Sequence, residues 1–449
     1  MRDRKVIMVS PVTRGCGQLS IQVAVERGRV VGAQVIGGLY RGWERILVGR
    51  DPADAPYLVE RLCGICSAAH GTASSVMLDR VYGIEVPAKG RLLRNLMLGA
   101  EFLQNHLRHF YLLVMPDYIE PPPGLGYDSQ AGGDRRFSWE ANQRLVDHYW
   151  ESVGIAQICH QMLALLGAKA PHAHGIVPGG ATVDPGTDVL NKLASLLARV
   201  RSFMEERMLP DTSLLAAAYP DYFRIGAGPG NYLSYGGFPD PGGVPAFTPG
   251  VVRAGIGEEV DINGITEYLR HTWLDEDDVL DPYKPGAYSW VEAVRYQGEP
   301  MEVGPLARAA VGGEEVNSSV MDRIMARSRE TSRIAEWMTG WLDEAAAANG
   351  PAYLQPGEIT ELEAVGVIEA PRGSLLHRVR VEGEKVAAYK LITPSEWNFS
   401  PRDDRGRMGV AEQSLIGIPV FDPGSPVEVG RVARSFDPCL YCATHVIGG

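Results

Sequence analysis

The stretch RLCGICSAAH, residues 61–70, and the stretch DPCLYCATH, residues 437–445, decide how this chain must fold. Each contains a Cys-x-x-Cys pair, whose two thiols a tight turn or a helix start can aim at one point. The two pairs hold four of the six cysteines and lie near opposite ends of the chain. We therefore expect a fold that closes both ends around a soft transition metal held by four thiolates.

The composition is that of a globular protein of 449 residues, with 45% hydrophobic and 22% charged residues. A net charge of −12 without a basic block disfavours nucleic-acid binding. Six cysteines in so long a chain do not suggest a disulfide scaffold. No apolar run is long enough to cross a bilayer, and no cleavable signal precedes the first strand-like stretch, so we expect no membrane insertion by this chain.

Apolar periodicity predicts a fold of the α+β class that is mainly α, with a core of long helices and peripheral β-hairpins. The expected helices span about 92–115, 138–166, 188–208 and 318–348, and the expected hairpins about 18–38 and 375–391. Residues 116–133 read as a loop and 209–315 as an irregular, partly stranded segment rich in Gly, Pro and Asp. We expect one domain over 1–449, with an N-terminal hairpin and CxxC module at about 1–90, a helical core at about 91–350, and a C-terminal β-containing and CxxC module at about 351–449.

The cysteine spacing alone fits a structural zinc site, a redox dithiol or a cluster ligand set. His70 lies four residues after Cys66 and could hydrogen-bond a ligand sulfur, or could be an ordinary core histidine. Asp437 places a carboxylate beside the second pair, which a proton-handling site needs and structural zinc rarely does. His445 follows Cys442 by three residues and could bind a second ion or close the site.

From end to end, the sequence resembles the large, catalytic subunit of [NiFe] hydrogenases. Its motifs are most similar to those of respiratory or uptake members. Both cysteine motifs carry the resemblance, in the forms Arg-x-Cys-Gly-Ile-Cys-x-x-x-His and Asp-Pro-Cys-x-x-Cys-x-x-His. Further matching segments follow in the family's order: residues 11–14, 40–44, 49–52, 95–97, 106–111, 171–172, 178–180, 369–373, 397–403 and 414–417. The resemblance implies the fold of that subunit and heterolytic cleavage of H₂.

The resemblance also implies a binuclear nickel–iron centre whose iron carries CO and two cyanide ligands. Cys63 and Cys439 would be terminal nickel ligands, and Cys66 and Cys442 would bridge nickel to iron. An open position must remain for H₂.

Other site residues are implied in the same way. Arg372 would hydrogen-bond one cyanide above the open position, with Pro371 fixing its approach, and Ser395 would donate to the other cyanide. Leu375 would line the dry wall around these ligands. A magnesium ion would use Glu44, His445 and the carbonyl of Leu391.

Two positions depart from the family pattern. Residues 13–18 read TRGCGQ, so Cys16 stands where the family usually has a glutamate that takes a proton from a nickel thiolate. A thiol has an ordinary pKa of about 8.5, against about 4.3 for a glutamate carboxyl. Asn105 replaces a usual aspartate. Cys16 could relay protons itself, Asp437 with Arg372 or water could take over the route, or Cys16 could be only a small buried apolar residue.

Alternatives to a fast enzyme are an H₂ sensor and a non-catalytic subunit with metal in a four-cysteine structural site. The quinone-site subunit of respiratory complex I shares the fold but lacks the four cysteines.

Cys159 stands alone, so no further cysteine set is available for iron–sulfur clusters. We therefore expect a small subunit that carries such clusters, maturation factors that load the metals, and H₂ as substrate. Only residues 446–449 follow His445, a short tail for the family's usual cleaved extension. The expected location is cytoplasmic, or membrane-associated or exported only through a partner.

Overall fold

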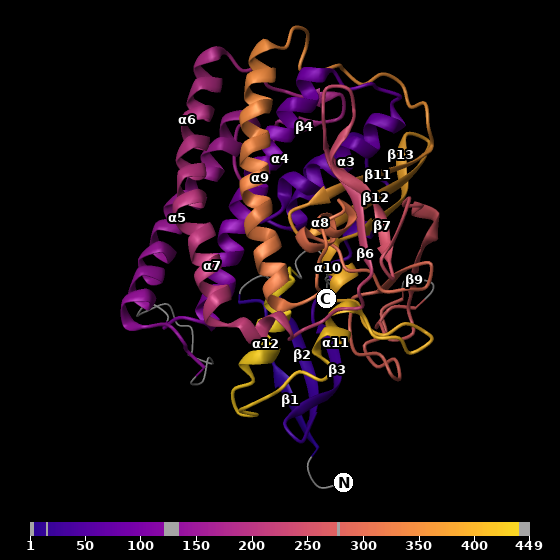
Figure 1. Cartoon of the computed structure of the whole chain (residues 1–449). Helices are drawn as coiled ribbons and strands as arrows, with labels where there is room; N and C mark the ends of the chain where they lie inside the picture. Colours follow the sequence, from indigo (N-terminus) through magenta and orange to yellow (C-terminus); the bar gives the residue numbers. More distant parts are fainter. Residues whose placement is uncertain (1–3, 15–16, 121–133, 276–278, 440–449) are drawn as a thin grey trace.

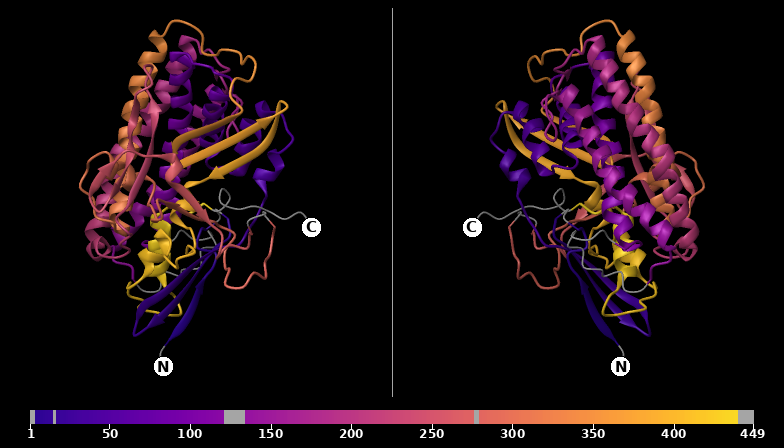
Figure 2. Two further views of the ribbon diagram at one scale, coloured as in Figure 1. Left: turned by 90° about the vertical axis from the view of Figure 1, so that its right-hand side faces the viewer. Right: turned by 90° about the vertical axis from the view of Figure 1, so that its left-hand side faces the viewer.

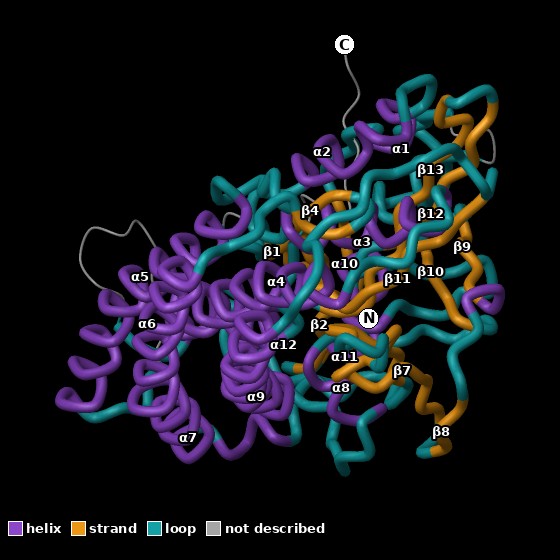
Figure 3. Tube along the Cα trace, turned by 90° about the horizontal axis from the view of Figure 1, so that it is seen from above, coloured by secondary structure: helices purple, strands orange, loops and turns teal. Residues whose placement is uncertain are grey.

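The long helices form one side of the molecule and most of the strands the other (Figures 1 and 3). The computed structural model describes residues 4–14, 17–120, 134–275 and 279–439. The four long helices are α4 (Ala88–Arg108), α5 (Trp139–Gly167), α6 (Thr187–Phe203) and α9 (Val320–Ala347). They confirm the four helices expected from the sequence, although the first continues as a π-helical turn (His109–Val114) and a 3₁₀ turn (Met115–Asp117).

Both predicted hairpins are present, and each belongs to a three-stranded antiparallel sheet. The N-terminal sheet contains β1 (Lys5–Val9), β2 (Leu19–Glu26) and β3 (Arg29–Gly37) and lies at one end of the molecule (Figure 2). The second sheet contains β11 (Glu363–Ala370), β12 (Gly373–Glu382) and β13 (Lys385–Ile392). Each hairpin turns on two residues with positive φ, a geometry that matches the twist of the flanking strands.

The segment 209–315 is more regular than its composition suggested. It contains α7 (Leu209–Ala218), β6 (Tyr232–Pro239), β7 (Pro245–Arg253), β8 (Ile256–Glu258), β9 (Ile265–Tyr268), β10 (Ala293–Tyr296) and α8 (Pro305–Val311). The expectation of an irregular segment missed α7 and α8 because each carries a proline in its first turn, at Pro210 and Pro305. Proline is tolerated there, since the first turn has no intrahelical partner for its missing N–H.

Short elements position the two cysteine motifs. The first motif leads into α3 (Ser67–Val81), and the second follows α12 (Val427–Ser435). The remaining short α-helices and strands of the described residues are α1 (Trp43–Leu47), α2 (Ala55–Val59), β4 (Ile176–Val177), β5 (Gly180–Ala181), α10 (Pro394–Asn398) and α11 (Val410–Leu415).

A single hydrophobic cluster contains residues from all three expected segments of the chain. Val12, Cys63, Phe102 and Cys439 belong to it, so the two ends share a core with the long helices. The division into modules stays a prediction. Among the described residues, no helix has both the length and the apolar character that a membrane span requires.

Candidate metal centre

Three thiols from the two cysteine motifs meet in the interior. The sulfur atoms of Cys63, Cys66 and Cys439 lie within 4.8 Å of one another, and all three residues are buried. Cys63 Sγ and Cys439 Sγ are 3.5 Å apart although their residues are 376 positions apart in the chain. That separation is too long for a disulfide, whose S–S bond is about 2.05 Å. Cys442, His445 and Cys16 lie outside the described residues.

The local backbone explains how each motif presents its sulfur. Cys66 is the N-cap residue of α3, so its side chain projects from the start of the helix, as the spacing predicted. Cys63 follows a 3₁₀ turn (Glu60–Leu62), and its sulfur accepts a hydrogen bond of 3.3 Å from the backbone N–H of Ile65. The backbone N–H of Cys439 donates to Ser395 Oγ at 3.2 Å, which places Ser395 directly beside the second motif.

Asp437 lies two residues before Cys439, and its backbone has a φ of 60°. Its Oδ1 lies 3.1 Å from Arg372 Nε, and its Oδ2 accepts a hydrogen bond of 2.7 Å from Asn105 Nδ2. Burial opposes the charged form, yet the positive charge of Arg372 and further basic neighbours holds the pKa of Asp437 below its ordinary value. Asp437 therefore stays ionised at neutral pH.

Pro371 and Arg372 form the connection between β11 and β12. The buried guanidinium of Arg308 donates to the carbonyl oxygens of Ala370 and Pro371, each at 3.1 Å. These bonds hold the turn, and so Arg372, in place. Leu375, on β12, is buried in the same hydrophobic cluster as the three cysteines.

His70 belongs to a buried chain of hydrogen bonds that the sequence did not reveal. Its Nδ1 lies 3.1 Å from His377 Nε2, and His377 Nδ1 lies 2.8 Å from the hydroxyl of Tyr389. Burial lowers the pKa of His70 to about 4, although the charge of Cys439 acts in the opposite direction. His70 is therefore a neutral imidazole, held from the side of β12 and β13.

The expected magnesium ligands Glu44 and Leu391 are neighbours. Glu44 Oε1 accepts a hydrogen bond of 2.8 Å from the backbone N–H of Leu391 and lies 3.6 Å from Lys390 Nζ. This contact involves the N–H of Leu391, and the role of its carbonyl as a magnesium ligand stays a prediction. Glu267 and Glu292 also pair with Lys390, so carboxylates predominate around this ammonium group.

A buried ion-pair cluster links the segment before Cys16 to the helix before the second motif. The carboxylate of Asp117 accepts hydrogen bonds from Arg434 Nε at 2.6 Å and from Arg434 Nη2 at 2.7 Å. Arg14 Nη2 binds the same carboxylate. Burial would raise the pKa of Asp117, but Arg14 and Arg434 hold it below its ordinary value. Sequence spacing gave no signal for this cluster.

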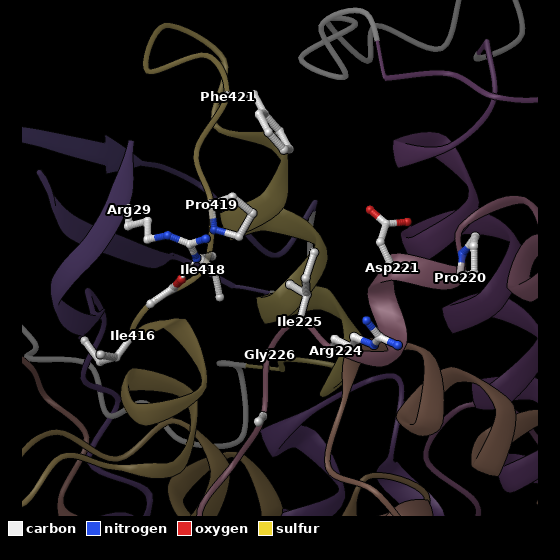
Figure 4. A pocket seen from close by; sticks show the side chains of 12 residues that line it. Arg29, Pro220, Asp221, Arg224, Ile225, Gly226, Ile416, Ile418, Pro419 and Phe421 are labelled. Carbon is white, nitrogen blue, oxygen red and sulfur yellow. Dashed lines mark hydrogen bonds between the residues drawn. The ribbon is translucent and has the colours of Figure 1, made fainter. Parts of the chain in front are cut away.

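A surface pocket of about 710 Å³ has no expected site residue in its lining. Arg29, Arg224 and Asp221 supply its charged side chains, and Ile225 and Phe421 are among the apolar ones (Figure 4). Surface concavity therefore does not locate the thiol cluster, which is buried.

Comparisons with known proteins agree over the length of the chain. The family model described as nickel-dependent hydrogenase matches residues 41–139, 133–318 and 310–445. The periplasmic [NiFeSe] hydrogenase large subunit of Desulfomicrobium baculatum is 36% identical, covering 99% of this chain and 96% of that protein. The hydrogenase-2 large chain of Escherichia coli is 28% identical, covering 98% and 97%. The solved structure of the Ni-Fe-Se hydrogenase from D. vulgaris Hildenborough in the reduced state has a TM-score of 0.94 at 40% identity, covering 98% of this chain and 100% of that one.

Proposed function

Because this chain belongs to the nickel-dependent hydrogenase family, as the large subunit of an enzyme that oxidises H₂, we propose that its four motif cysteines hold the nickel–iron centre that splits H₂ heterolytically. The observation that carries this proposal is the convergence of Cys63, Cys66 and Cys439 within 4.8 Å, in a buried cluster. Buried thiols from two motifs suit a soft metal, because soft metals bind thiolate ligands in preference to oxygen ligands.

The roles proposed for the four thiolates are those that the resemblance to the hydrogenase family implies. Cys63 and Cys439 would hold the nickel, and Cys66 and Cys442 would hold nickel together with iron. Two of the relatives are named for selenium, whereas the sequence of this chain has cysteine at all four motif positions, so all four protein ligands of the centre would be sulfur atoms. When bound, the centre supplies the Lewis-acid and redox chemistry that polarises H₂ and accepts its electrons.

The surroundings of the thiols suit an iron that carries CO and two cyanides. Arg372 would donate to one cyanide, from the turn that Arg308 holds through the carbonyl oxygens of Ala370 and Pro371. Ser395 would donate to the other cyanide, since its oxygen accepts from Cys439 N–H and its own proton remains to donate. Leu375 excludes water on the apolar side.

Asp437 orients Arg372 and does not itself carry protons. A carboxylate whose pKa lies below its ordinary value holds a proton poorly at neutral pH. Of the routes considered for the proton, the one through Asp437 is therefore the least favoured.

Partners follow from the electrons that H₂ releases. An iron–sulfur small subunit takes them, since the four motif cysteines are used and Cys159 is alone. Maturation factors load the metals. Glu44, Leu391 and His445 would hold a magnesium ion. Export occurs together with the small subunit, which the periplasmic location in one relative's name supports.

H₂-dependent reduction of a dye by the purified two-subunit complex tests the function. Cys63→Ser and Cys439→Ser each remove a thiolate, so both variants should lose H₂ oxidation and nickel together. Cys159→Ala is the matched control, because Cys159 is buried in α5 outside both motifs. A complex in which Cys439→Ser keeps its nickel and its rate would contradict the proposal.

A further inference from the structure

Arg308 uses every N–H group of its guanidinium inside the protein. It is buried on α8, a helix that packs against both α9 and β12 (Figure 1). Its Nε and Nη2 donate to the two carboxylate oxygens of Glu330, at 2.7 and 2.6 Å, and its Nη1 donates to Glu369 at 2.6 Å. Nη1 and Nη2 also donate to the carbonyl oxygens of Ala370 and Pro371, each at 3.1 Å. A guanidinium has five N–H donors, and all five are used here.

The two carboxylates that bind this guanidinium are themselves held by other elements. Glu330, on α9, lies 2.8 Å from His106 Nε2 on α4. Glu369, on β11, accepts hydrogen bonds from Ser374 Oγ at 2.6 Å and from the backbone N–H of Tyr235 at 2.9 Å. Charge-assisted hydrogen bonds in a buried network are strong and rigidify the interior. The guanidinium is therefore fixed relative to two long helices and to the strand that precedes the turn.

Arg372 follows directly after the two carbonyl groups that Arg308 holds. A Cβ at Gly304, the N-cap residue of α8, would lie 2.8 Å from the backbone oxygen of Arg372, so the helix that carries Arg308 packs directly against this residue. The side chain of Arg372 donates from Nε to the backbone oxygen of Asp437 at 3.2 Å, two residues before Cys439. Arg372 thus reaches from the turn that Arg308 fixes to the segment that carries a motif thiol.

We propose that Arg308 is a positioning residue of the H₂-splitting site, which fixes the turn before Arg372 and so sets where the guanidinium of Arg372 lies at the metal centre. The proposal rests on the function proposed above. Arg308 acts through the backbone of the turn, so its positive charge alone is not sufficient. A lysine has three N–H donors on one nitrogen and cannot hold both carboxylates and both carbonyl groups.

The test uses the purified two-subunit complex and the variant Arg308→Lys. A misplacement of about 1 Å can cost about 10²-fold in rate, so H₂ oxidation should fall at least about tenfold, with nickel and iron contents unchanged. Arg94→Lys is the matched control and should keep the rate. Arg94 is also buried, binds both oxygens of Asp79 and donates to the carbonyl oxygens of Val177 and Gly180, but it holds the hairpin of β4 and β5.

A coupling measurement separates positioning of Arg372 from a general loss of structure. Changes that act through one side chain are not additive, whereas independent changes multiply their effects on the rate. Arg308→Lys should therefore cost little further rate in a complex that already carries Arg372→Lys. A double variant that is slower by the product of the two single factors would overturn the proposal.

A second readout does not depend on turnover. The infrared spectrum of the loaded complex contains the cyanide stretching bands of the proposed centre, and Arg308→Lys should shift the same band that Arg372→Lys shifts, whereas Arg94→Lys should not. Glu330→Gln keeps the size of its side chain and weakens the hold on Arg308, so it should shift that band in the same direction.

Unshifted cyanide bands in Arg308→Lys would overturn the proposal. If Arg308→Lys does not keep its metals, unshifted bands in Glu330→Gln would do so. Loss of the metals from both variants would also overturn it, because the cluster would then have a structural role alone. Absence of cyanide bands and of H₂ oxidation from the unmodified complex would instead contradict the proposed function.

Discussion

Replacing Asp117 by Asn should destabilise the protein far more than an ordinary loss of one charge. Asp117 is 2% exposed and accepts two hydrogen bonds from Arg434, while Arg14 binds the same carboxylate. An asparagine at this place presents an NH₂ group to donors and leaves two guanidinium groups without their countercharge. The perturbation removes one formal charge and leaves the volume of the side chain almost unchanged.

The magnitude follows from burial. Breaking a buried ion pair by removing one partner costs about 3–5 kcal/mol, because the remaining charge stays desolvated. The entropy of unfolding is about 2.1 cal/mol/K per residue, so for 449 residues this cost lowers Tm by about 3–5 °C. The exposed i,i+4 pair of Arg201 and Glu205 supplies the control, since breaking it should cost only about 0.3–0.5 kcal/mol.

The assay is thermal unfolding of Asp117→Asn and Glu205→Gln beside the unmodified complex, with nickel content measured in parallel. Arg434 lies on α12, which leads into Cys439, so Asp117→Asn should also retain less nickel. Equal Tm values for the two variants would refute the reasoning, because they would show that the buried cluster contributes no more than a surface pair.

Three further changes have defined outcomes. Burial raises the pKa of Glu60 to about 9, so the stabilising contribution of this carboxyl is complete below its ordinary pKa and is lost as pH rises through about 9. The Tm of the unmodified protein should therefore fall relative to Glu60→Gln between about pH 5 and about pH 9, and a constant difference would show the pKa to be ordinary. Arg372→Lys keeps the charge but loses the planar fork, so H₂ oxidation should fall at least about tenfold at unchanged nickel content, and an unchanged rate would exclude an orienting role. Glu44→Gln should lower the magnesium content per complex, whereas the exposed control Glu382→Gln should not; equal magnesium in both would contradict the ligand assignment.

Much of the fold could be predicted because it depends on local pattern. The 3.6-residue spacing of apolar residues located the ends of α5 and α9 to within two residues, and the turn residues located both hairpins. The failures at α7 and α8 have one cause. A proline in a first helical turn looks the same in sequence as a proline that ends a helix.

The convergence of the motif cysteines could also be expected, since two spaced pairs of one chemistry suggest one centre. The side chains that support it could not. Asp117 and Arg434 are 317 residues apart, and no local signal assigns them to each other. Glu101 did leave a trace, because an acidic residue within the buried stretch of α4 breaks its apolar pattern, but only the structure shows that it binds the start of α3.

The nickel, iron and zinc content of the complex, purified with its partner subunit from its own host, tests the central claim most directly. The account predicts about one nickel per large subunit, no zinc in the thiol cluster, and iron in excess, since the partner's clusters add to the iron of the centre. Zinc in place of nickel would contradict it, and would mean that Cys63, Cys66 and Cys439 form a closed structural site in a hydrogenase fold.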